Sequence, residues 1–573
     1  MKGAGPVSRP LDLLLWAGLL ALVAALGLNQ ISSFDYWWML RTGQLIAETG
    51  AVPRVDPYTY SALGARWIDI HWLHQLGLWG LYRMGGHTAV GIWQFVAMLL
   101  VVALVAPLGR CPGRSWLSVA ALALMLLNAA FRFSPRPESS SFVLLAGVLA
   151  LLDRFERTGD ARVYGIVVLQ LIWVNTHGLF ALGIALCGIH LAAELLRALG
   201  GAPQGLRTAR VRRLGAVTLL ALLAALANPN GLDAALYPLQ QLGMIGPVDT
   251  RAAFGIAELL PAIGKLTPIK LAVFLTTAGF SAAALALNWR RVPLADLLVW
   301  VAFLYLALGA IRNVALFAIV VTPILVRNAN AWLDTRPGFA AWSRTASLVV
   351  LALVLVPTWD AARGEFYPRD GLLKRPGFGA TPWFTPDRAV DWIEENAPPG
   401  RIAHTMKTGG YLTWRLYPDY PVLVDGRLEV FGVERFRQLL IRDGKDFARL
   451  DAEFGFGTAL VRFAPKKNAG PLITWLHANR DWRLVYLDDF DAVFVRADAG
   501  HTELDLDAPG AFEALDGSGD WFDELRLRNR TFFLASIGRF DLALAAWNQL
   551  LALFPAAENG RSIHAWLESE SRS

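Results

Sequence analysis

The chain has 573 residues, of which 55% are hydrophobic and 17% charged, and its mean hydropathy is +0.41. Soluble domains carry roughly 25% charged residues, so this composition excludes an ordinary soluble protein and indicates a multi-spanning membrane protein with some soluble mass. The net charge of +6 does not indicate nucleic-acid binding, because the Lys and Arg residues are scattered between hydrophobic segments, as in membrane-protein loops.

Eleven apolar segments have the composition of membrane-spanning helices, which need about 20 mainly apolar residues, or fewer inside a bundle. They are 11–29, 87–106, 115–131, 139–154, 163–176, 178–197, 214–228, 268–288, 294–310, 313–327 and 345–358. The first is longer than the apolar core of a cleaved signal peptide, about 7–15 residues, so we interpret it as a retained signal anchor. Segment 71–84 is shorter and contains two histidines and Arg83, so we assign it to an interfacial helix.

With segment 71–84 outside the membrane, arginines concentrate in the loops of one side, as the positive-inside rule requires. This pattern predicts a cytoplasmic N-terminus and a C-terminus on the outer face. We therefore expect a polytopic α-helical bundle over 1–358, whose first outer loop is 30–86. Two further regions follow it, an extracytoplasmic α/β domain over 359–500 and a helical tail over 501–573.

Short apolar runs alternate with helical patterns in the region 359–500, which is typical of a small α/β domain. The expected strands are Arg401–Ala403, Pro421–Val424, Ala459–Phe463, Leu484–Leu487 and Ala492–Val495, and the expected helices are 387–396, 433–450 and 470–479. The tail segment RNRTFFLASIGRFDLALAAWNQLLALFP resembles one tetratricopeptide repeat, with Gly538 at the turn, Ala545 on the packing face and Pro555 at the end. Because one repeat cannot bury its own apolar face, we expect it to pack on the preceding domain or on a partner.

The first outer loop carries the most concentrated set of candidate site residues. Asp35 follows the first span, and the aromatic pair Trp37 and Trp38 comes soon after it. An ionisable group at a membrane boundary is unfavourable to keep without a role, so we expect Asp35 to be a catalytic base. Alternatively, Asp35 is the N-cap of a helix that starts near Trp37, and the tryptophans are interfacial anchors. Asp56 precedes Pro57 and fits either a turn or a catalytic role.

Other polar residues near helix ends fall on the same predicted side. They are His71, Arg136 between two prolines, Asn175 and His177 in WVNTHG, and Arg312 and Asn313 in AIRNV. A guanidinium matches the oxygens of a phosphate, and an arginine at membrane depth needs an anionic partner, so Arg136 and Arg312 are candidate phosphate ligands. Arg136 also fits a snorkelling role, and His177 a structural one, since no spacing indicates a metal site.

A carboxylate, guanidinium groups and aromatic rings at one membrane face suit a sugar joined through phosphate to a lipid. One carboxylate suffices for an inverting transfer, in which the acceptor oxygen attacks as the lipid phosphate leaves. Asp35 and Asp56 also fit the carboxylate pair of a glycoside hydrolase, but a hydrolase leaves the many spans unexplained. The sequence has no phosphate-binding glycine loop, so it does not indicate a nucleotide-driven pump.

The loop DYWWMLRTGQLIAETGAVPRVDPYTYSALGARWIDIHWL resembles the first outer loop of a bacterial multi-spanning family within the type-C glycosyltransferase superfamily. Further matches follow in the same order: Arg136–Pro137, Trp173–Gly178, Asn228–Gly231, Arg312–Asn313 and Gly409–Gly432. The resemblance implies an enzyme of the bacterial inner membrane that uses polyprenyl-phosphate sugars, with Asp35 as base or as ligand of a divalent metal ion. Two positions depart from the family pattern, Met39 for a histidine and His71 for a glutamate.

We therefore expect a glycosyltransferase that moves a hexose or pentose from a polyprenyl-phosphate donor to a glycan, lipid or protein acceptor. The expected catalytic residues are Asp35, Asp56 and His71, and the expected substrate-binding residues are Trp37, Trp38, Arg41, Arg136, Asn175, His177, Arg312, Asn313, Asp425 and Arg427. Asp35, Arg136 and Arg312 should line one pocket open to the outer leaflet, and the element Asp425–Arg427 fits a turn or an acceptor-facing surface. The alternatives are a polymerase or ligase of lipid-linked oligosaccharides, a transporter or flippase of lipid-linked sugars, and a membrane scaffold.

Overall fold

The structure is a computed structural model, and the chain separates into two compact units made of non-contiguous stretches. It describes residues 9–111, 113–199, 204–245, 257–370, 372, 374–381, 383–463, 469–508, 512, 515, 521–557 and 559–572. Unit 1 comprises Met1–Ser33, Thr42–Val52 and Ile68–Thr381, and unit 2 comprises Phe34–Arg41, Pro53–Trp67 and Pro382–Ser573. Parts of the predicted first outer loop thus belong to the same unit as the C-terminal region. The predicted domain boundaries at 358/359 and 500/501 stay predictions.

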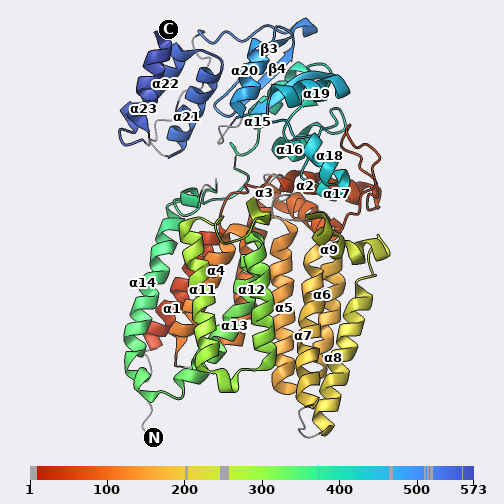
Figure 1. Cartoon of the computed structure of the whole chain (residues 1–573), viewed down its shortest axis with the longest axis vertical. Coiled ribbons are helices and arrows are strands. Elements are labelled where there is room, and N and C mark those ends of the chain that lie inside the picture. The colour runs from red at the N-terminus through yellow and green to blue at the C-terminus, as the bar shows by residue number, and fades with distance from the viewer. Residues whose placement is uncertain are drawn as a thin grey trace. The chain divides into compact units, whose positions relative to one another are not determined.

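Unit 1 is a bundle of long helices (Figure 1). Its helices are α1 Arg9–Gly27, the second half of α2 Asp35–Thr49, α3 Trp72–Val105, α4 Ser115–Ala129, α5 Pro137–Thr158, α6 Gly165–Val174, α7 Ala181–Leu199, α8 Gln204–Ala224, α9 Gly231–Ile245, α11 Pro268–Leu287, α12 Leu294–Gly309, α13 Val314–Leu333 and α14 Ser343–Ala362. Short 3-10 turns, among them Ala130–Arg132, Ala257–Leu259 and Ile311–Asn313, stand at or between helix ends.

Each of the eleven predicted spans overlaps one of these helices. Among the described residues, seven helices are long and apolar enough to cross a membrane: Arg9–Gly27, Trp72–Gly109, Ser115–Arg132, Gly178–Leu199, Pro268–Leu287, Ile311–Leu333 and Ser343–Ala362. The chain is therefore a multi-pass membrane protein. The count of eleven stays a prediction, because α6 and α12 are short for a span, and α5 and α8 carry several charged residues.

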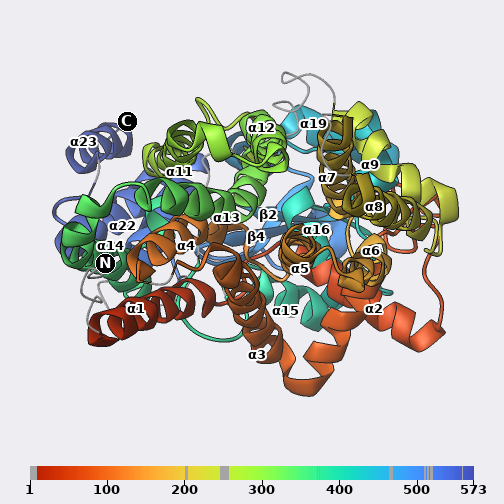
Figure 2. The same ribbon diagram turned by 90° about the horizontal axis from the view of Figure 1, so that it is seen from below.

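Helix α13 lies at the centre of the bundle. Its first half, VALFAIVVTPILV, is apolar on every side, and such a helix is stable only where neighbours surround it. Every residue from 314 to 326 is buried. Viewed along the bundle, α13 lies between α4 on one side and α11 and α12 on the other (Figure 2). The residues at both ends of α13 are therefore held by several neighbouring helices.

Helix α3 is interrupted by a pair of glycines. Gly85 and Gly86 have non-helical backbone angles, and Gly86 has φ 61° and ψ −153°, a conformation that only glycine adopts readily. This break lies at the predicted boundary between segment 71–84 and the span 87–106. The first part of α3 packs closely on α2, because a β-carbon on Gly43 would stand 2.0 Å from the Gln75 carbonyl oxygen.

Unit 2 contains a four-stranded mixed sheet in the order β1-β2-β4-β3. The strands are β1 Arg401–Ala403, β2 Phe456–Arg462, β3 Trp482–Leu487 and β4 Asp491–Arg496; β1 and β2 are parallel, and the other pairs are antiparallel. The helices are α15 Asp387–Asn396, α16 Met406–Leu416, α17 Leu428–Phe431, α18 Val433–Gln438, α19 Gly444–Phe454 and α20 Gly470–Ala478. The central strands β2 and β4 are buried on both faces, which explains their continuous apolar runs.

Two predicted elements of this region are wrong. The predicted helix 433–450 is two helices, because Asp443 starts α19 by accepting hydrogen bonds from the amides of Lys445 and Asp446. Segment Pro421–Val424 is not a strand of the sheet. It pairs with the first loop instead, where the Tyr60 amide donates to the Val422 carbonyl (3.0 Å) and the Val422 amide donates to the Tyr58 carbonyl (2.9 Å). The local apolar pattern correctly indicated an extended segment here, but it could not indicate that the segment pairs with the first loop.

The tail is three helices, α21 Trp521–Ser536, α22 Phe540–Leu553 and α23 Gly560–Ser571. Gly538 has φ 78° and makes the turn between the first two, as expected. The placement of Ala545 on the packing face is wrong, because Ala545 is exposed and Ala543 and Ala546 are buried. The tail packs on the α/β part of unit 2, where the buried Asp489 accepts from two arginines of α21, Arg526 (2.7 Å) and Arg530 (2.9 Å).

Candidate functional site

Asp35 is the first residue of α2. The helix expected to start near Trp37 thus begins two residues earlier, at Asp35 itself. Its side chain is half-buried, and the Trp38 indole Nε1 donates to Asp35 Oδ1 at 3.4 Å. The carboxylate therefore lies at the start of α2, partly open to solvent.

Two glycines of the C-terminal region let the chain approach this helix end closely. A β-carbon on Gly410 of α16 would stand 2.7 Å from the Phe34 carbonyl oxygen, and one on Gly426 would stand 2.2 Å from Asp35 Oδ1. Real β-carbons essentially never make contacts below 3.0 Å, so a side chain at 410 would meet the backbone, and one at 426 would force the Asp35 carboxylate to shift. The sequence motifs around 409–410 and 425–427 thus form part of the surroundings of Asp35.

Arg427 is the centre of a buried ion-pair network next to Gly426. Its guanidinium contacts Asp425 Oδ2 at 2.6 Å and Asp56 Oδ1 at 2.8 Å, and all three side chains are 0% exposed. The Asp56 carboxylate also accepts from the amides of Tyr58 (3.2 Å) and Thr59 (3.1 Å), which is a turn stabilised by its own side chain. Asp56, Asp425 and Arg427 are therefore joined in one fully buried network, in which Arg427 Nη1 has no hydrogen-bond partner among the described residues.

Aromatic rings complete the surroundings of Arg427. Its guanidinium carbon lies 4.5 Å from the ring centre of Trp67, 5.0 Å from that of Tyr58 and 5.8 Å from that of Trp38. Ring faces attract a cation, most strongly where water is excluded. Trp38 is thus a wall of this buried cage, and Trp37, 4% exposed, packs edge-on against Tyr411 of α16 at 4.8 Å.

Arg41, one turn further along α2, is bound to the same unit. Its guanidinium donates to the Tyr417 carbonyl at 3.1 Å and lies 5.3 Å from the Tyr417 ring centre. These contacts hold the first two turns of α2 on the segment after α16. The predicted residues Asp35, Trp37, Trp38, Arg41, Asp56, Asp425 and Arg427 all belong to unit 2 and lie around the start of α2.

The remaining predicted residues belong to unit 1, where three arginines and two glutamates gather. Arg132 forms ion pairs with both Glu138 and Glu258, and Arg136 lies 3.4 Å from Glu258. Burial alone would raise the pKa of the Glu258 carboxyl, but the charges of Arg132 and Arg136 outweigh it and hold that pKa well below its usual range. Glu258 is therefore ionised, and the two arginines are largely neutralised by glutamates.

Arg312 differs from the other two arginines. Its side chain is half-buried in the turn before α13, within the electrostatic field of Glu138 and Glu258. It forms no hydrogen bond and no ion pair with any residue that the structure describes. Its guanidinium thus retains its donors for an anion, while its neighbour Asn313 is used structurally and donates to the Leu306 carbonyl at 2.9 Å.

Two histidines lie beside this group. The rings of His71 and His177 are 5.6 Å apart. Ser141 Oγ accepts from Trp173 Nε1 at 2.8 Å, which leaves its own proton for His177 Nδ1, also at 2.8 Å. The His71 Nδ1 atom is buried and has no hydrogen-bond partner among the described residues. His71 therefore presents a ring nitrogen that the fold does not satisfy.

Asn175 fastens three segments of unit 1 together. Its amide donates to the carbonyls of Leu171 and Ala227, each at 2.9 Å, and its oxygen accepts from Trp72 Nε1 at 2.9 Å. The amide group of Asn175 is therefore used in contacts within the protein. These contacts hold the chain next to His71 and His177.

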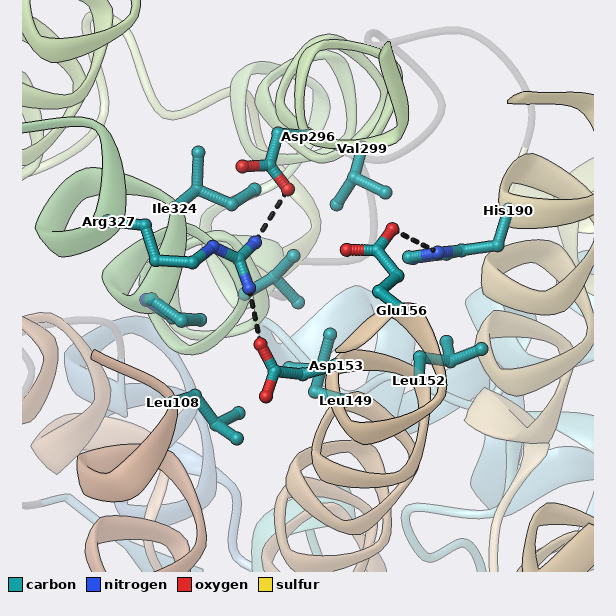
Figure 3. Close-up of a pocket in the computed structure, with 12 residues that line it drawn as sticks. Leu108, Leu149, Leu152, Asp153, Glu156, His190, Asp296, Val299, Ile324 and Arg327 are labelled. Carbon is teal, nitrogen blue, oxygen red and sulfur yellow. Dashed lines mark hydrogen bonds and ion pairs between the residues drawn. The ribbon is translucent and has the colours of Figure 1, made fainter. Parts of the chain in front are cut away.

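A second charged group lines a pocket at the other end of α13. Arg327 forms ion pairs with Asp153 of α5 at 2.7 Å and Asp296 of α12 at 2.6 Å, while His190 of α7 contacts Glu156 at 3.0 Å (Figure 3). Fifteen residues of helix separate Arg327 from Arg312, or about 22 Å at 1.5 Å per residue. These ion pairs connect four helices, α5, α7, α12 and α13.

In the part of the chain that the structure describes, no ligand set for a divalent metal ion is assembled. Among the described residues, no group of three His, Cys, Asp or Glu side chains is placed to hold one. In unit 2 the carboxylates nearest Arg427 are already paired with it, as described above.

Comparison with known proteins identifies the fold through structure alone. No protein-family model and no curated protein matches the sequence. The oligosaccharyltransferase AglB of Archaeoglobus fulgidus, in complex with an inhibitory peptide and a dolichol-phosphate, superposes with a TM-score of 0.59 at 13% identity, over 87% of this chain and 75% of that chain. Its apo form gives 0.53 over 82% and 71%. The apo structure of ArnT from Cupriavidus metallidurans gives 0.49 at 15% identity, over 84% and 97%.

The chain therefore shares the fold of the Archaeoglobus fulgidus oligosaccharyltransferase. This likeness agrees with the fold that the resemblance of the first loop implied, and membership of the superfamily stays a prediction. An identity of 13% carries no information on the donor, the acceptor or the reaction. The bacterial origin, the tetratricopeptide likeness of the tail and the roles of individual residues stay predictions.

Several residues of these clusters were not predicted to be site residues. Glu138 directly follows the predicted Arg136–Pro137 pair and lies in the first turn of α5. An acidic residue beside this pair could have been recognised from the sequence as a partner for an arginine. Gly426 sits inside the recognised Asp425–Arg427 element but has no side chain to suggest a role. Lys374, which is buried and donates to the Phe133 carbonyl at 2.8 Å, lies in a stretch with no motif.

Proposed function

We propose that this protein is a membrane glycosyltransferase that takes a sugar from a polyprenyl-phosphate carrier and transfers it to a hydroxyl acceptor on the outer face. The observation that carries the proposal is Arg312, a half-buried guanidinium that forms no ion pair with any acidic residue in the described part of the chain. A cation in such surroundings needs an anionic partner, and a lipid phosphate is an anion that arrives from the membrane. The likeness in fold to an oligosaccharyltransferase solved with a dolichol-phosphate supports the choice.

In the proposed reaction, Asp35 accepts the proton of the acceptor hydroxyl as its oxygen attacks the anomeric carbon of the sugar. The bond between that carbon and the phosphate oxygen breaks, and the polyprenyl phosphate leaves with the electron pair. A single displacement inverts the anomeric configuration. Arg312 binds the phosphate and stabilises the charge that grows on the leaving oxygen. Asp35 and Arg312 belong to different units, so the pocket predicted to hold both stays a prediction.

The other predicted residues take supporting roles in this proposal. Arg136 lies against Glu258 and contributes to the positive surroundings of the phosphate. His71, with an unsatisfied ring nitrogen, is a hydrogen-bond partner for the sugar or the phosphate. We propose that Asp56, Asp425 and Arg427 act through structure, because all three side chains are fully buried and the two carboxylates are ion-paired with the guanidinium. This occupancy also disfavours a hydrolase that uses Asp35 and Asp56 as its carboxylate pair.

The proposal is tested with a panel of radiolabelled undecaprenyl-phosphate sugars and the full-length protein in liposomes. We expect transfer of label from at least one donor to an acceptor fraction, with release of undecaprenyl phosphate in equal amount. A transporter would move the lipid-linked sugar across the bilayer without releasing the phosphate. A scaffold would do neither, and either result would contradict the proposal.

A further inference from the structure

We propose that Gly426 is a positioning residue for the Asp35 carboxylate, which makes the turn of the C-terminal region a part of the catalytic arrangement. This inference rests on the proposed function, in which Asp35 is the base. The observation behind it is steric. A β-carbon on Gly426 would meet Asp35 Oδ1 at 2.2 Å, Asp35 Cγ at 3.4 Å and Trp38 Nε1 at 3.6 Å. The carboxylate therefore occupies the space that any other residue at 426 would take.

The turn that carries Gly426 is held in place and does not yield. Its two neighbours are the fully buried Asp425 and Arg427, and Arg427 is bound to Asp56 of the first loop and surrounded by three rings. Breaking a buried, hydrogen-bonded charge pair is strongly unfavourable. A side chain added at 426 therefore displaces its neighbour rather than the turn.

A β-carbon at position 426 would displace the Asp35 carboxylate. The two closest atoms to the added β-carbon belong to this one side chain, and no backbone atom lies among the three nearest. Trp38 is 3% exposed and packs on Trp67 at 6.2 Å between ring centres, so it offers less freedom than the half-buried carboxylate. Gly426 also has no left-handed φ, so alanine fits its backbone without strain.

Displacement of a general base is expected to reduce the rate of the chemical step. A base acts within hydrogen-bond distance of the proton it takes, and a misplacement of about 1 Å lowers the rate roughly 100-fold. Binding of the donor phosphate does not involve this carboxylate. Gly426→Ala should therefore lower kcat by about 10- to 100-fold and leave the KM for the undecaprenyl-phosphate sugar and the thermal unfolding midpoint close to those of the wild type.

A double-mutant cycle with Asp35→Asn tests whether Gly426 acts through Asp35. The assay uses the full-length protein and the donor that the wild type transfers in the panel. If the inference is correct, Gly426→Ala lowers kcat in the wild type and has no further effect in the Asp35→Asn background. Equal losses in both backgrounds, or an unchanged kcat in Gly426→Ala, would overturn it. Absence of transfer by the wild type would instead remove the proposed function and the inference together.

Two other glycines serve as controls. A β-carbon on Gly80 meets nothing within 4 Å, so Gly80→Ala should behave as the wild type. One on Gly409 would meet the Val424 backbone carbonyl oxygen at 1.9 Å, so Gly409→Ala should lower the unfolding midpoint instead of kcat alone. If Gly426→Ala itself proves unstable, Asp35→Ala added to it should restore the midpoint by removing the overlapping carboxylate. Failure of that rescue would contradict the inference.

Discussion

The two arginines that the sequence singled out, Arg136 and Arg312, differ in what surrounds them. Arg136 lies against Glu258, whereas Arg312 has no hydrogen bond or ion pair within the described part of the chain. A neutralised cation attracts an anionic ligand less strongly than an available one. At the scale of single residues, Arg312 is therefore the stronger candidate for the phosphate of the donor.

Replacing Arg312 tests this assignment directly. We expect Arg312→Ala to weaken binding of undecaprenyl phosphate by about 10- to 100-fold, as for loss of a charge-assisted hydrogen bond of about 1.5–3 kcal/mol. Binding is measured by thermophoresis of the full-length protein in detergent. Arg336→Ala, at an exposed arginine, is the matched control and should bind as the wild type. Equal affinity of Arg312→Ala and wild type would contradict the phosphate assignment.

His404 is a residue whose titration should affect stability in unit 2. Its Nε2 accepts from the Leu423 amide at 2.8 Å and its Nδ1 donates to the Thr405 carbonyl at 2.9 Å, so the fold uses the neutral ring. Burial lowers the pKa of His404 to about 4. Because the unfolded chain takes up the proton first, this contribution is complete above about pH 6.5 and is lost as the pH falls toward 4, by about 3 kcal/mol.

The measurement is hydrogen exchange of peptides that cover 401–427, in the wild type and in His404→Gln, between pH 7 and pH 4.5 and corrected for intrinsic rates. The wild type should lose protection over this range, and the variant, which does not titrate there, should change much less. Parallel behaviour of the two proteins would show that another group governs the pH dependence.

At the scale of elements, the Arg427 network joins the first loop to the turn at 425–427. Removing the guanidinium leaves two buried carboxylates without their cationic partner, so Arg427→Met should destabilise unit 2 by about 3–5 kcal/mol. Arg435→Met is the control, because its ion pair with Glu453 is exposed and should contribute less than about 1 kcal/mol. Urea unfolding followed by proteolysis compares them. Similar midpoints for the two variants would contradict the role assigned to Arg427.

The charged group around Arg327 makes a corresponding prediction for the helical bundle. Arg327→Gln leaves Asp296 without its arginine and leaves Asp153 with Arg157 alone, so it should destabilise the bundle by about 2–3 kcal/mol, less than a fully buried pair because Arg327 is 31% exposed. Adding Asp153→Asn and Asp296→Asn removes the unpaired charges and should recover most of the loss. Thermal unfolding in detergent measures both. No recovery in the triple variant would show that the arginine acts through something other than these carboxylates.

The elements that sequence predicted well are those set by local pattern. Helical spans follow from length and apolarity, and β2, β3 and β4 follow from short apolar runs, so their places agree with the structure within a few residues. Local pattern failed at Pro421–Val424, whose partner is the first loop more than 350 residues earlier, and at Ala545, where a repeat motif gave the wrong face. The burial of Asp56 was also beyond local pattern, because its partner Arg427 comes from a distant segment.

At the scale of the whole molecule, the topology remains a prediction with a direct test. Cys111 and Cys187 are both buried, so a variant with both replaced by alanine accepts single reporter cysteines. In intact bacterial cells, a membrane-impermeant maleimide should label Arg572→Cys in the tail. It should label Arg290→Cys, in a predicted cytoplasmic loop, only after permeabilisation. The reverse pattern would contradict the positive-inside orientation on which the outer site depends.

The division into two units also explains why the candidate site is spread over the chain. The start of α2 and the segment 53–67 fold with the C-terminal region, whereas the arginine cluster folds with the bundle. The residues predicted for the base and those predicted for the phosphate therefore come from different units.

The most direct test of the central claim compares Asp35→Asn with the wild type on the donor identified in the panel. The two side chains have nearly the same shape, so only the ability to accept a proton differs. We predict that Asp35→Asn binds undecaprenyl phosphate as tightly as the wild type and transfers sugar at least about 100-fold more slowly, within the range for loss of a general base. Transfer at the wild-type rate by Asp35→Asn would contradict the assignment of Asp35 as the base.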